Sequence, residues 1–392
     1  MGINAFFSRI ISYGMISINN GVLLIWKDPN IFLERRTYVT FHFECYKALG
    51  QDFEDLMYVL GKMSGYNSSV TLGDIFGVGK DKIWSDNPKD SDNFTNGATQ
   101  DGWGDVKITK YTDNTPKSFI EFEIIDKNLP TDIINAYKEK KDVKLHTYVT
   151  GILGGGCKYL SKTESDAYEK QCVVNNDSYT KCLVRGDNVE KELKSKILQD
   201  LKIDMKDLYS KSAPMYKSRK YEFKPSTAFK INFGDGSFKI KNYHGSVMVI
   251  ISYCILHHAL KRKLDAKKYQ EILNKTSLAQ CESLKKELIN VKGFGFKSLQ
   301  TILDDVSMFG YGKFEVIITG ENNKTVWIYN KNNPVAKDYL TLFGKQENPV
   351  DDYLSSLFTN IFKTFFNLNV TCTEVNCIAK MNNSCEFKII IE

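Results

Sequence analysis

The chain has 392 residues, which is enough for two or three domains that each bury a core. Its hydrophobic content of 42% and charged content of 26% are typical of a globular protein, and no apolar run of about eighteen residues predicts a membrane span. The net charge is +6, but residues 191–224 alone contribute +5 (ten Lys/Arg against five Asp/Glu), so the two halves are close to neutral, which argues against a nucleic-acid-binding platform in either.

No small-residue cleavage site follows the first apolar residues of the chain, so we expect a cytoplasmic protein whose nine cysteines are thiols or metal ligands.

The sequence of the N-terminal half predicts helices followed by a hairpin. Apolar spacing and turn residues then predict a strand over residues 21–26, a long helix over 38–63 that ends at Gly65, and a short helix over 72–76. A polar loop over 80–102 and a hairpin of 105–110 with 118–124 follow.

Another helix is predicted over residues 146–159, although it contains Gly151 and the run from Gly154 to Gly156. Glycine inside a helix costs roughly 1 kcal/mol relative to alanine. We therefore expect another segment to approach this helix closely. The run lacks the Gly-Lys-Ser/Thr ending of a phosphate-binding loop.

A basic segment, residues 190–227, follows the first half. Apolar residues at helical spacing predict a connector helix within it: Leu193, Ile197, Leu201, Met205 and Leu208. The alternative is a signalling arm or an arm that contacts nucleic acid. Charge runs of this size are usually solvated faces, and no DNA-binding motif is recognisable, so nucleic acid is not the expected partner.

The C-terminal half repeats the same order of elements. The predicted elements are a strand over residues 238–243, a helix over 244–263 and a shorter helix over 299–306. A hairpin of 313–318 with 324–329, an amphipathic helix over 353–366 and a final strand over 386–391 follow. The hairpins of the two halves open alike, with Gly-Trp-Gly around Trp103 and Gly-Tyr-Gly around Tyr311.

Metal-ligand residue types also recur in the two halves. The C-terminal set is Asp351, Glu374, Cys377 and Cys385, and the N-terminal set is His146, Glu169, Cys172 and Cys182. The first three pairs keep an offset of 205 residues. Such a repeat predicts a duplicated unit, with domains at 1–189 and 228–392 and a linker at 190–227.

Each set suits a zinc knuckle. Two thiolates with one or two nitrogen or oxygen ligands give tetrahedral zinc, and four protein ligands make the site structural rather than catalytic. The residues from Met381 to Ser384 are typical of a turn that returns Cys385 to Cys377. In the alternative interpretation the cysteines are small buried hydrophobic residues and Glu374 lies on the surface.

The C-terminal run from Tyr353 through Val370 and Glu374-Val-Asn-Cys377 to Cys385-Glu-Phe resembles the closing half of the 4-vinyl reductase domain. That domain occurs in archaeal hydrocarbon-binding proteins and as the sensor domain of aromatic-responsive bacterial activators. In zinc-bearing members one ligand precedes a Glu-x-x-Cys-x7-Cys knuckle by a helix. The first ligand of the family is usually Cys, so Asp351 and His146 depart from its pattern.

The resemblance implies an α/β (α+β) fold with two tandem domains, each an antiparallel sheet with helices on one side and a pocket between them. Its shape is shared with TRAPP tethering subunits and with nitric-oxide-binding domains. The family commonly forms homodimers, so the two copies are expected to pack as an intramolecular pseudo-dimer, and a homodimer is also possible. Trp103 and Tyr311 are the pocket residues that their matched positions suggest.

The expected function is a sensor or carrier of an apolar or aromatic small molecule. Zinc is the expected cofactor, and it is expected more in the second domain than in the first. One alternative is a protein–protein interaction scaffold similar to tethering subunits, and another is a transcription-associated regulator that acts through the basic linker. No nucleophile–base arrangement and no dinucleotide-binding glycine motif is recognisable, so we predict a protein that is not an enzyme.

Overall fold

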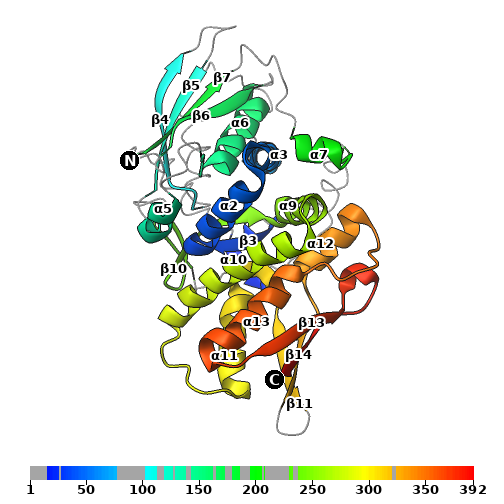
Figure 1. Ribbon diagram of the computed structural model, residues 1–392. Coiled ribbons are helices and arrows are strands. Elements are labelled where there is room, and N and C mark those ends of the chain that lie inside the picture. The colour runs from blue at the N-terminus through cyan, green and yellow to red at the C-terminus, as the bar shows by residue number, and fades with distance from the viewer. Residues whose placement is uncertain are drawn as a thin grey trace.

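The computed structural model describes most of the chain as a mixed α+β fold with antiparallel sheets, so the predicted fold class is confirmed at this level (Figure 1). No helix in the described part of the chain is long and apolar enough to cross a bilayer. The described residues are 16–25, 28–76, 102–112, 119–126, 129–137, 143–161, 165–172, 179–185, 195–204, 207, 229–232, 237–319 and 324–392.

Strands and helices occur in both halves of the chain. The strands are β1 (Ile16–Asn19), β2 (Val22–Ile25), β3 (Asp28–Glu34), β4 (Asp105–Thr112), β5 (Phe119–Ile125), β6 (Asp166–Gln171), β7 (Thr180–Arg185), β8 (Phe229–Asn232), β9 (Ser237–Ile240), β10 (Tyr243–Val249), β11 (Phe314–Thr319), β12 (Thr325–Asn330), β13 (Val370–Asn376) and β14 (Cys385–Ile391). The helices are α2 (Arg35–Leu49), α3 (Gln51–Phe76), α5 (Thr131–Tyr137), α6 (Thr147–Ser161), α7 (Lys196–Asp200), α9 (Ile250–Lys263), α10 (Ala266–Glu287), α11 (Phe296–Val306), α12 (Pro334–Phe343) and α13 (Asp352–Phe366), with short helical turns η3 (Ser307–Tyr311) and η5 (Ile378–Lys380).

A six-stranded sheet takes three strands from each half, in the order β1-β2-β3-β10-β9-β8. Strands β2 and β9 begin 215 residues apart (22 and 237), as do β3 and β10 (28 and 243) and helices α2 and α9 (35 and 250). Strands β3 and β10 pair antiparallel, and Phe32 lies opposite Val247, which follows it by the same interval. The three strands of each half therefore follow the same order from the edge of the sheet to its centre, and β3 pairs with β10 in a symmetric register.

Two four-stranded sheets complete the fold, and they have matching orders: β4-β5-β7-β6 and β11-β12-β14-β13. Helices α6 and α13 each have 15 residues and begin 205 residues apart, at 147 and 352. The edge strands β6 and β13 have a register irregularity directly after Glu169 and Glu374 respectively. Figure 1 shows the first of these sheets at the top of the view and the second at the bottom, with α2, α9 and α10 between them.

Contacts cross between the halves at the central sheet. The indole Nε1 of Trp103 donates to the carbonyl oxygen of Val247 on β10, at 3.1 Å. On the opposite side, the backbone N–H of Gly312 donates to the carbonyl oxygen of Gly21, at 2.8 Å. Gly310 has a φ of 96°, and a Cβ there would lie 2.3 Å from the carbonyl oxygen of Asn30, so only glycine allows this approach. The two halves therefore share one continuous core.

The long helix predicted over residues 38–63 is instead two helices, α2 and α3, which break at Gly50, where φ is 56°. The prediction that Gly65 ends this helix is wrong, because α3 continues to Phe76 and includes the short helix expected at 72–76. A Cβ at Gly65 would lie 2.1 Å from the carbonyl oxygen of Ile152. This glycine therefore permits a helix–helix contact rather than a helix end.

The helix predicted over 244–263 begins only at Ile250, because residues 243–249 form β10. Apolar side chains on both faces of β10 are buried, so the run lacks the alternation that marks a half-buried strand. Helices α10 and α12 were not predicted. The hairpins β4–β5 and β11–β12 and helices α6, α11 and α13 confirm their predictions to within a few residues.

Within the basic segment the structure describes only residues 195–204 and 207, and there the predicted connector helix is reduced to α7. Lys202 has a φ of 54°, a left-handed conformation that ends a helix. Leu193, Met205 and Leu208 lie outside the described residues, as does the predicted loop 80–102 except for Gly102.

Candidate metal centres and a buried aromatic cavity

The knuckle of the second half brings Glu374, Cys377 and Cys385 together. One ligand atom from each lies within 4.8 Å of the other two, and all three side chains are buried. The two sulfur atoms are 3.8 Å apart. Between the cysteines, the turn η5 and a left-handed Met381 (φ 72°) reverse the chain, as the turn residues predicted. The backbone N–H of Ile378 donates to Cys385 Sγ at 3.4 Å, a contact that favours a thiolate there.

These donors fit zinc. Two thiolates on one tetrahedral zinc ion, each about 2.3 Å from it, are separated by about 3.8 Å, which is the separation between Cys377 Sγ and Cys385 Sγ in this structure. Among the described residues the carboxylate oxygen Oε1 of Glu374 is buried with no nitrogen or oxygen hydrogen-bond partner, although a buried carboxylate normally has one. A cation at this point would satisfy it.

The charges of this cluster are coupled. Burial raises the pKa of Glu374 to about 9. The hydrogen bond from the Cys385 thiol lowers the pKa of Cys377 to about 6, and the same contact raises the pKa of Cys385. The two thiols of Cys377 and Cys385 therefore lose one proton readily, and they lose the second only when a nearby positive charge compensates for it. Binding of a divalent cation supplies that charge and releases the remaining proton.

Asp351, the expected fourth ligand, is not a member of this group of three. It is the N-cap of α13, and its Oδ1 accepts from the backbone N–H of Leu354. Its Oδ2 accepts from Asn333 Nδ2 at 2.7 Å, and its own backbone N–H donates to Glu374 Oε2 at 3.0 Å. Asp351 therefore orients Glu374 in this structure.

In the first half the structure brings His146, Glu169 and Cys172 together by the same criterion. His146 directly precedes α6, as Asp351 precedes α13. Among the described residues neither carboxylate oxygen of Glu169 makes a hydrogen bond of ordinary geometry to nitrogen or oxygen, and burial together with the nearby Glu54 raises the pKa of this carboxyl to about 8.

Cys182 is not a member of the first group. Its sulfur lies 3.1 Å from Thr150 Oγ1. In the strand pair β6–β7 it lies opposite Glu169, and the residue opposite Glu374 in β13–β14 is Phe387. Cys182 therefore occupies the position of Phe387, and its expected equivalence to Cys385 is corrected by this register.

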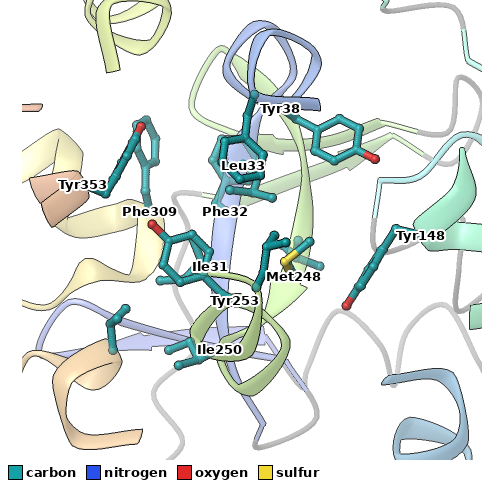
Figure 2. Packing of buried hydrophobic residues seen from close by; sticks show 14 of the residues in the cluster. Ile31, Phe32, Leu33, Tyr38, Tyr148, Met248, Ile250, Tyr253, Phe309 and Tyr353 are labelled. Atoms are coloured by element: carbon teal, nitrogen blue, oxygen red, sulfur yellow. The ribbon is translucent and has the colours of Figure 1, made fainter. Parts of the chain in front are cut away.

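A small cavity of about 20 Å³ lies between the halves, and its lining is apolar. Tyr253 and His257 of α9, together with Tyr311 and Tyr353, contribute aromatic rings from the second half. Leu33 and Tyr38 of the first half also line the cavity. Figure 2 shows Leu33, Tyr38, Tyr253 and Tyr353 projecting from separate elements around this region. The volume is sufficient for about one water molecule.

The two residues expected in a pocket differ in position. Tyr311 lines the cavity. Trp103 does not: it is 1% exposed and packs against Tyr38 and Tyr148, with ring centroids 5.1 and 5.0 Å away. The larger ring of Trp103 therefore lies in a filled part of the core.

Sequence reasoning missed two neighbours of the first metal group. Thr180 Oγ1 lies 2.9 Å from His146 Nδ1, and Asp126 Oδ2 lies 3.8 Å from His146 Nε2. Asp126 also pairs with Arg35 at 3.1 Å. Thr180 is separated from Cys385 by the same 205 residues that relate the other ligand pairs, so this offset in the sequence is a signal that identifies it.

No protein-family model and no curated protein matches this chain. Among solved structures, the phenol-responsive sensory domain of the transcription activator PoxR, in complex with phenol, is similar over 50% of this chain and 92% of its own, with 11% identity and a TM-score of 0.35. A vinyl-4-reductase family protein from Methanocaldococcus jannaschii is similar over 50% of this chain and 96% of its own, with 15% identity and a TM-score of 0.24.

Proposed function

We propose that this protein is a sensor or carrier that binds a small apolar or aromatic molecule in the cavity between its halves. The observation that carries the proposal is the Tyr253 hydroxyl, which is buried beside that cavity, where it interacts with Tyr311 but makes no hydrogen bond of ordinary geometry among the described residues. An unsatisfied buried hydroxyl costs about 1–3 kcal/mol. A ligand with one polar group would satisfy it while its apolar part contacts the surrounding rings.

The lining supports a ligand that is mainly apolar. Tyr311 and Tyr353 stack with ring centroids 5.7 Å apart, and Tyr253 lies 4.2 Å from His257. Burial lowers the pKa of His257 to about 3, so this imidazole is neutral and presents no charge to the cavity. Because the cavity is small, a ring-sized ligand requires these side chains to move apart, which is the kind of change that a sensor transmits.

Zinc at Glu374, Cys377 and Cys385 has a structural role in this proposal. The ion would join β13 to β14 and, through the Asp351 contact, the start of α13, which carries the cavity residue Tyr353. It would therefore hold one wall of the cavity in place. Asp351 remains available as the fourth ligand if Asn333 releases it.

The same proposal takes the chain as two tandem domains, 1–189 and 228–392, packed as a pseudo-dimer. Its support is the six-stranded sheet, in which equivalent residues Phe32 and Val247 lie opposite each other. A two-fold axis of a homodimer places equivalent residues opposite each other in this way. The cavity lies beside this junction, where a change in one half reaches the other.

The competing function is an interaction scaffold, and the small volume of the cavity favours it. A scaffold needs filled interiors, and about 20 Å³ is far below the roughly 300–1,000 Å³ of ordinary ligand pockets. The two functions differ in whether the cavity opens for a ligand.

Native mass spectrometry of gently purified protein distinguishes these functions. We expect an additional small mass, lost on mild activation and identified as an apolar or aromatic compound after extraction. Tyr311→Trp should fill the cavity as Trp103 fills its own surroundings, and should abolish this mass. Trp103→Tyr is the matched control and should retain it. If the protein carries no small molecule and binds none when small phenols or hydrocarbons are added, the scaffold interpretation replaces this one.

A further inference from the structure

The connection between α10 and α11, residues 288–295, presents apolar side chains to the outside. Ile289 is 70% exposed, the largest exposed fraction of any large hydrophobic side chain in the described chain, and Phe296, the first residue of α11, is 56% exposed. Figure 1 shows this connection at the lower left edge of the molecule. Single exposed apolar residues are ordinary, but two on one short connection at an edge of the protein indicate a contact surface.

The exposure of these two side chains is built into the loop, because its other apolar residues pack inward. The ring of Phe294 packs against Phe362 and Phe366 of α13, with centroids 5.6 and 5.4 Å away. Val291 packs against the same core, and its backbone N–H donates to the carbonyl oxygen of Leu288 at 3.1 Å. The loop is therefore fixed to the body of the protein.

Lysines flank the exposed apolar side chains. Residues 285–297 contain four lysines and one acidic residue, Glu287, which gives a net charge of +3. Lys286, Lys292 and Lys297 are exposed, and none of them forms an ion pair with a described carboxylate. The loop therefore offers positive charge that the rest of the described chain leaves unneutralised.

The ordinary role of lysine near a helix end explains only part of this charge. Lys285 and Lys286 lie in the last turn of α10, where a cation is favourable beside the negative end of the helix dipole. Lys297 lies in the first turn of α11, where the dipole disfavours a cation, and this turn has no acidic residue. Helix stability therefore accounts neither for Lys297 nor for the exposed ring of Phe296 before it.

Exposed apolar side chains flanked by lysines match the surface of an anionic lipid bilayer. Apolar side chains enter the boundary between headgroups and acyl chains, while lysines stay at the negatively charged headgroups. We propose that this loop docks the protein on such a surface, with Ile289 and Phe296 inserted and Lys292 and Lys297 at the lipid phosphates. The contact is peripheral, and it depends neither on the proposed apolar ligand nor on a metal ion.

Flotation of the full chain with lipid vesicles tests this proposal. We expect binding to vesicles of phosphatidylcholine with about 30% phosphatidylserine, and much weaker binding to phosphatidylcholine alone, because lysines are attracted only to the anionic surface. Added salt should weaken the binding, because it screens this attraction.

The double variant Ile289→Ser/Phe296→Ser should bind the anionic vesicles at least about tenfold more weakly, because it removes the apolar area that enters the bilayer. Ile317→Ser/Ile390→Ser is the matched control. It removes two apolar side chains of similar exposure, 49% and 47%, from β11 and β14, and it should bind as the wild-type protein does.

The charge is tested in the same way. Lys292→Gln/Lys297→Gln should weaken binding by about 25-fold, because each lysine near an anionic surface contributes about fivefold. Lys313→Gln/Lys324→Gln changes two exposed lysines just before β11 and β12, and it should leave binding unchanged.

Insertion itself is measured with Phe296→Trp. The fluorescence that this variant adds to the wild-type signal should shift to shorter wavelength on anionic vesicles, and brominated phosphatidylcholine should quench it. The inference is overturned if the wild-type protein does not float with anionic vesicles, if Ile289→Ser/Phe296→Ser binds them equally well, or if the added fluorescence is not quenched. Heparin is a polyanion without an apolar interior. Equally strong binding to heparin that the serine variant retains would assign the loop to a charged macromolecule instead, and would also overturn the inference.

Discussion

The helix pair α3–α6 of the first half and the pair α10–α13 of the second cover equivalent sheets but make different contacts. In the first half, glycines meet at the contact: a Cβ on Gly151 would lie 2.2 Å from the carbonyl oxygen of Tyr58, and one on Gly61 would lie 2.0 Å from that of Tyr148. In the second half, Ser277 and Ser356 lie at the corresponding contact and hydrogen-bond at 3.0 Å. Hydroxyl groups have replaced direct backbone contact.

The consequence is visible in the space beside each metal-ligand group. The hollow at Glu169 beside the first pair has a volume of about 70 Å³, and the groove that reaches Glu374 beside the second pair has a volume of about 730 Å³. The same fold therefore closes or opens this region through a few small residues. The opening beside each group is therefore larger where the two helices meet through serine side chains than where their backbones meet at glycines.

A buried ion pair is a second difference between the halves, and its removal should have the largest effect. Arg35 begins α2, bonds to Ser246 and Gly102 and pairs with Asp126, all in the core. Its counterpart 215 residues later is the apolar Ile250, which is fully buried. Arg35→Met leaves the Asp126 carboxylate buried without its cation, so the free energy of unfolding should fall by about 3–5 kcal/mol.

Urea denaturation measures this effect, and Ile250→Met is the matched control. That change conserves volume and polarity, so it should cost less than about 1.5 kcal/mol. Adding Asp126→Asn to Arg35→Met should recover part of the loss, because the unpaired charge is then gone. Equal costs for Arg35→Met and Ile250→Met would contradict the importance of the ion pair.

Gly151→Ala should have the next largest effect. Alanine gains about 1 kcal/mol of intrinsic helix stability over glycine, but the added Cβ meets the backbone of Tyr58 and Lys62, which cannot move without separating the helices. Overpacking of this kind costs about 1–3 kcal/mol or more. We therefore expect a net destabilisation of the folded chain, together with a wider hollow at Glu169.

The equivalent change in the second half, Ser356→Ala, removes one hydrogen bond to Ser277 and should cost about 1 kcal/mol or less. Comparing the unfolding free energies of the two variants tests the helix-spacing argument directly. A neutral or stabilising Gly151→Ala would show that α3 and α6 have room to spare and would remove the argument.

Much of each outer unit could be predicted from local pattern. Helix α13 has a clear amphipathic face, and the glycines of α6 indicated the close approach that α3 makes. The central sheet could not be predicted, because it depends on strands about 215 residues apart and β10 is buried on both faces. Periodicity carries no information about either feature.

The candidate sites show the same limit. The offset of 205 residues grouped Glu169 with Cys172 and Glu374 with Cys377, and the structure brings each pair together. For the last ligand, residue type favours Cys182, whereas the offset of 205 residues favours Thr180. Because side chains alternate along a strand, a shift of two residues keeps the same face but moves the group along it, and only the strand register distinguishes the two.

The smallest predicted effect compares two equivalent buried histidines, His42 on α2 and His257 on α9. Burial lowers the pKa of each to about 3, from an ordinary value of 6.5. The folded state therefore favours the neutral ring, so the stability from these histidines is complete above about pH 6.5 and is lost as the pH falls toward the folded pKa. Each histidine should lower the free energy of unfolding by up to about 1.4 kcal/mol per pH unit in this interval.

His42→Gln and His257→Gln should each reduce that acid-dependent slope by a similar amount, because both side chains are buried and burial lowers both pKa values to about 3. Unfolding midpoints in urea measured between pH 7 and pH 4.5 give the slopes. The hydrogen bond of His257 Nδ1 with the Tyr269 hydroxyl is 2.9 Å long, whereas His42 Nδ1 lies 3.5 Å from the Tyr38 hydroxyl and this ring also contacts the backbone of Lys144. A slope that changes in only one of the two variants would mean that these polar contacts, rather than burial, set the titration of the histidine.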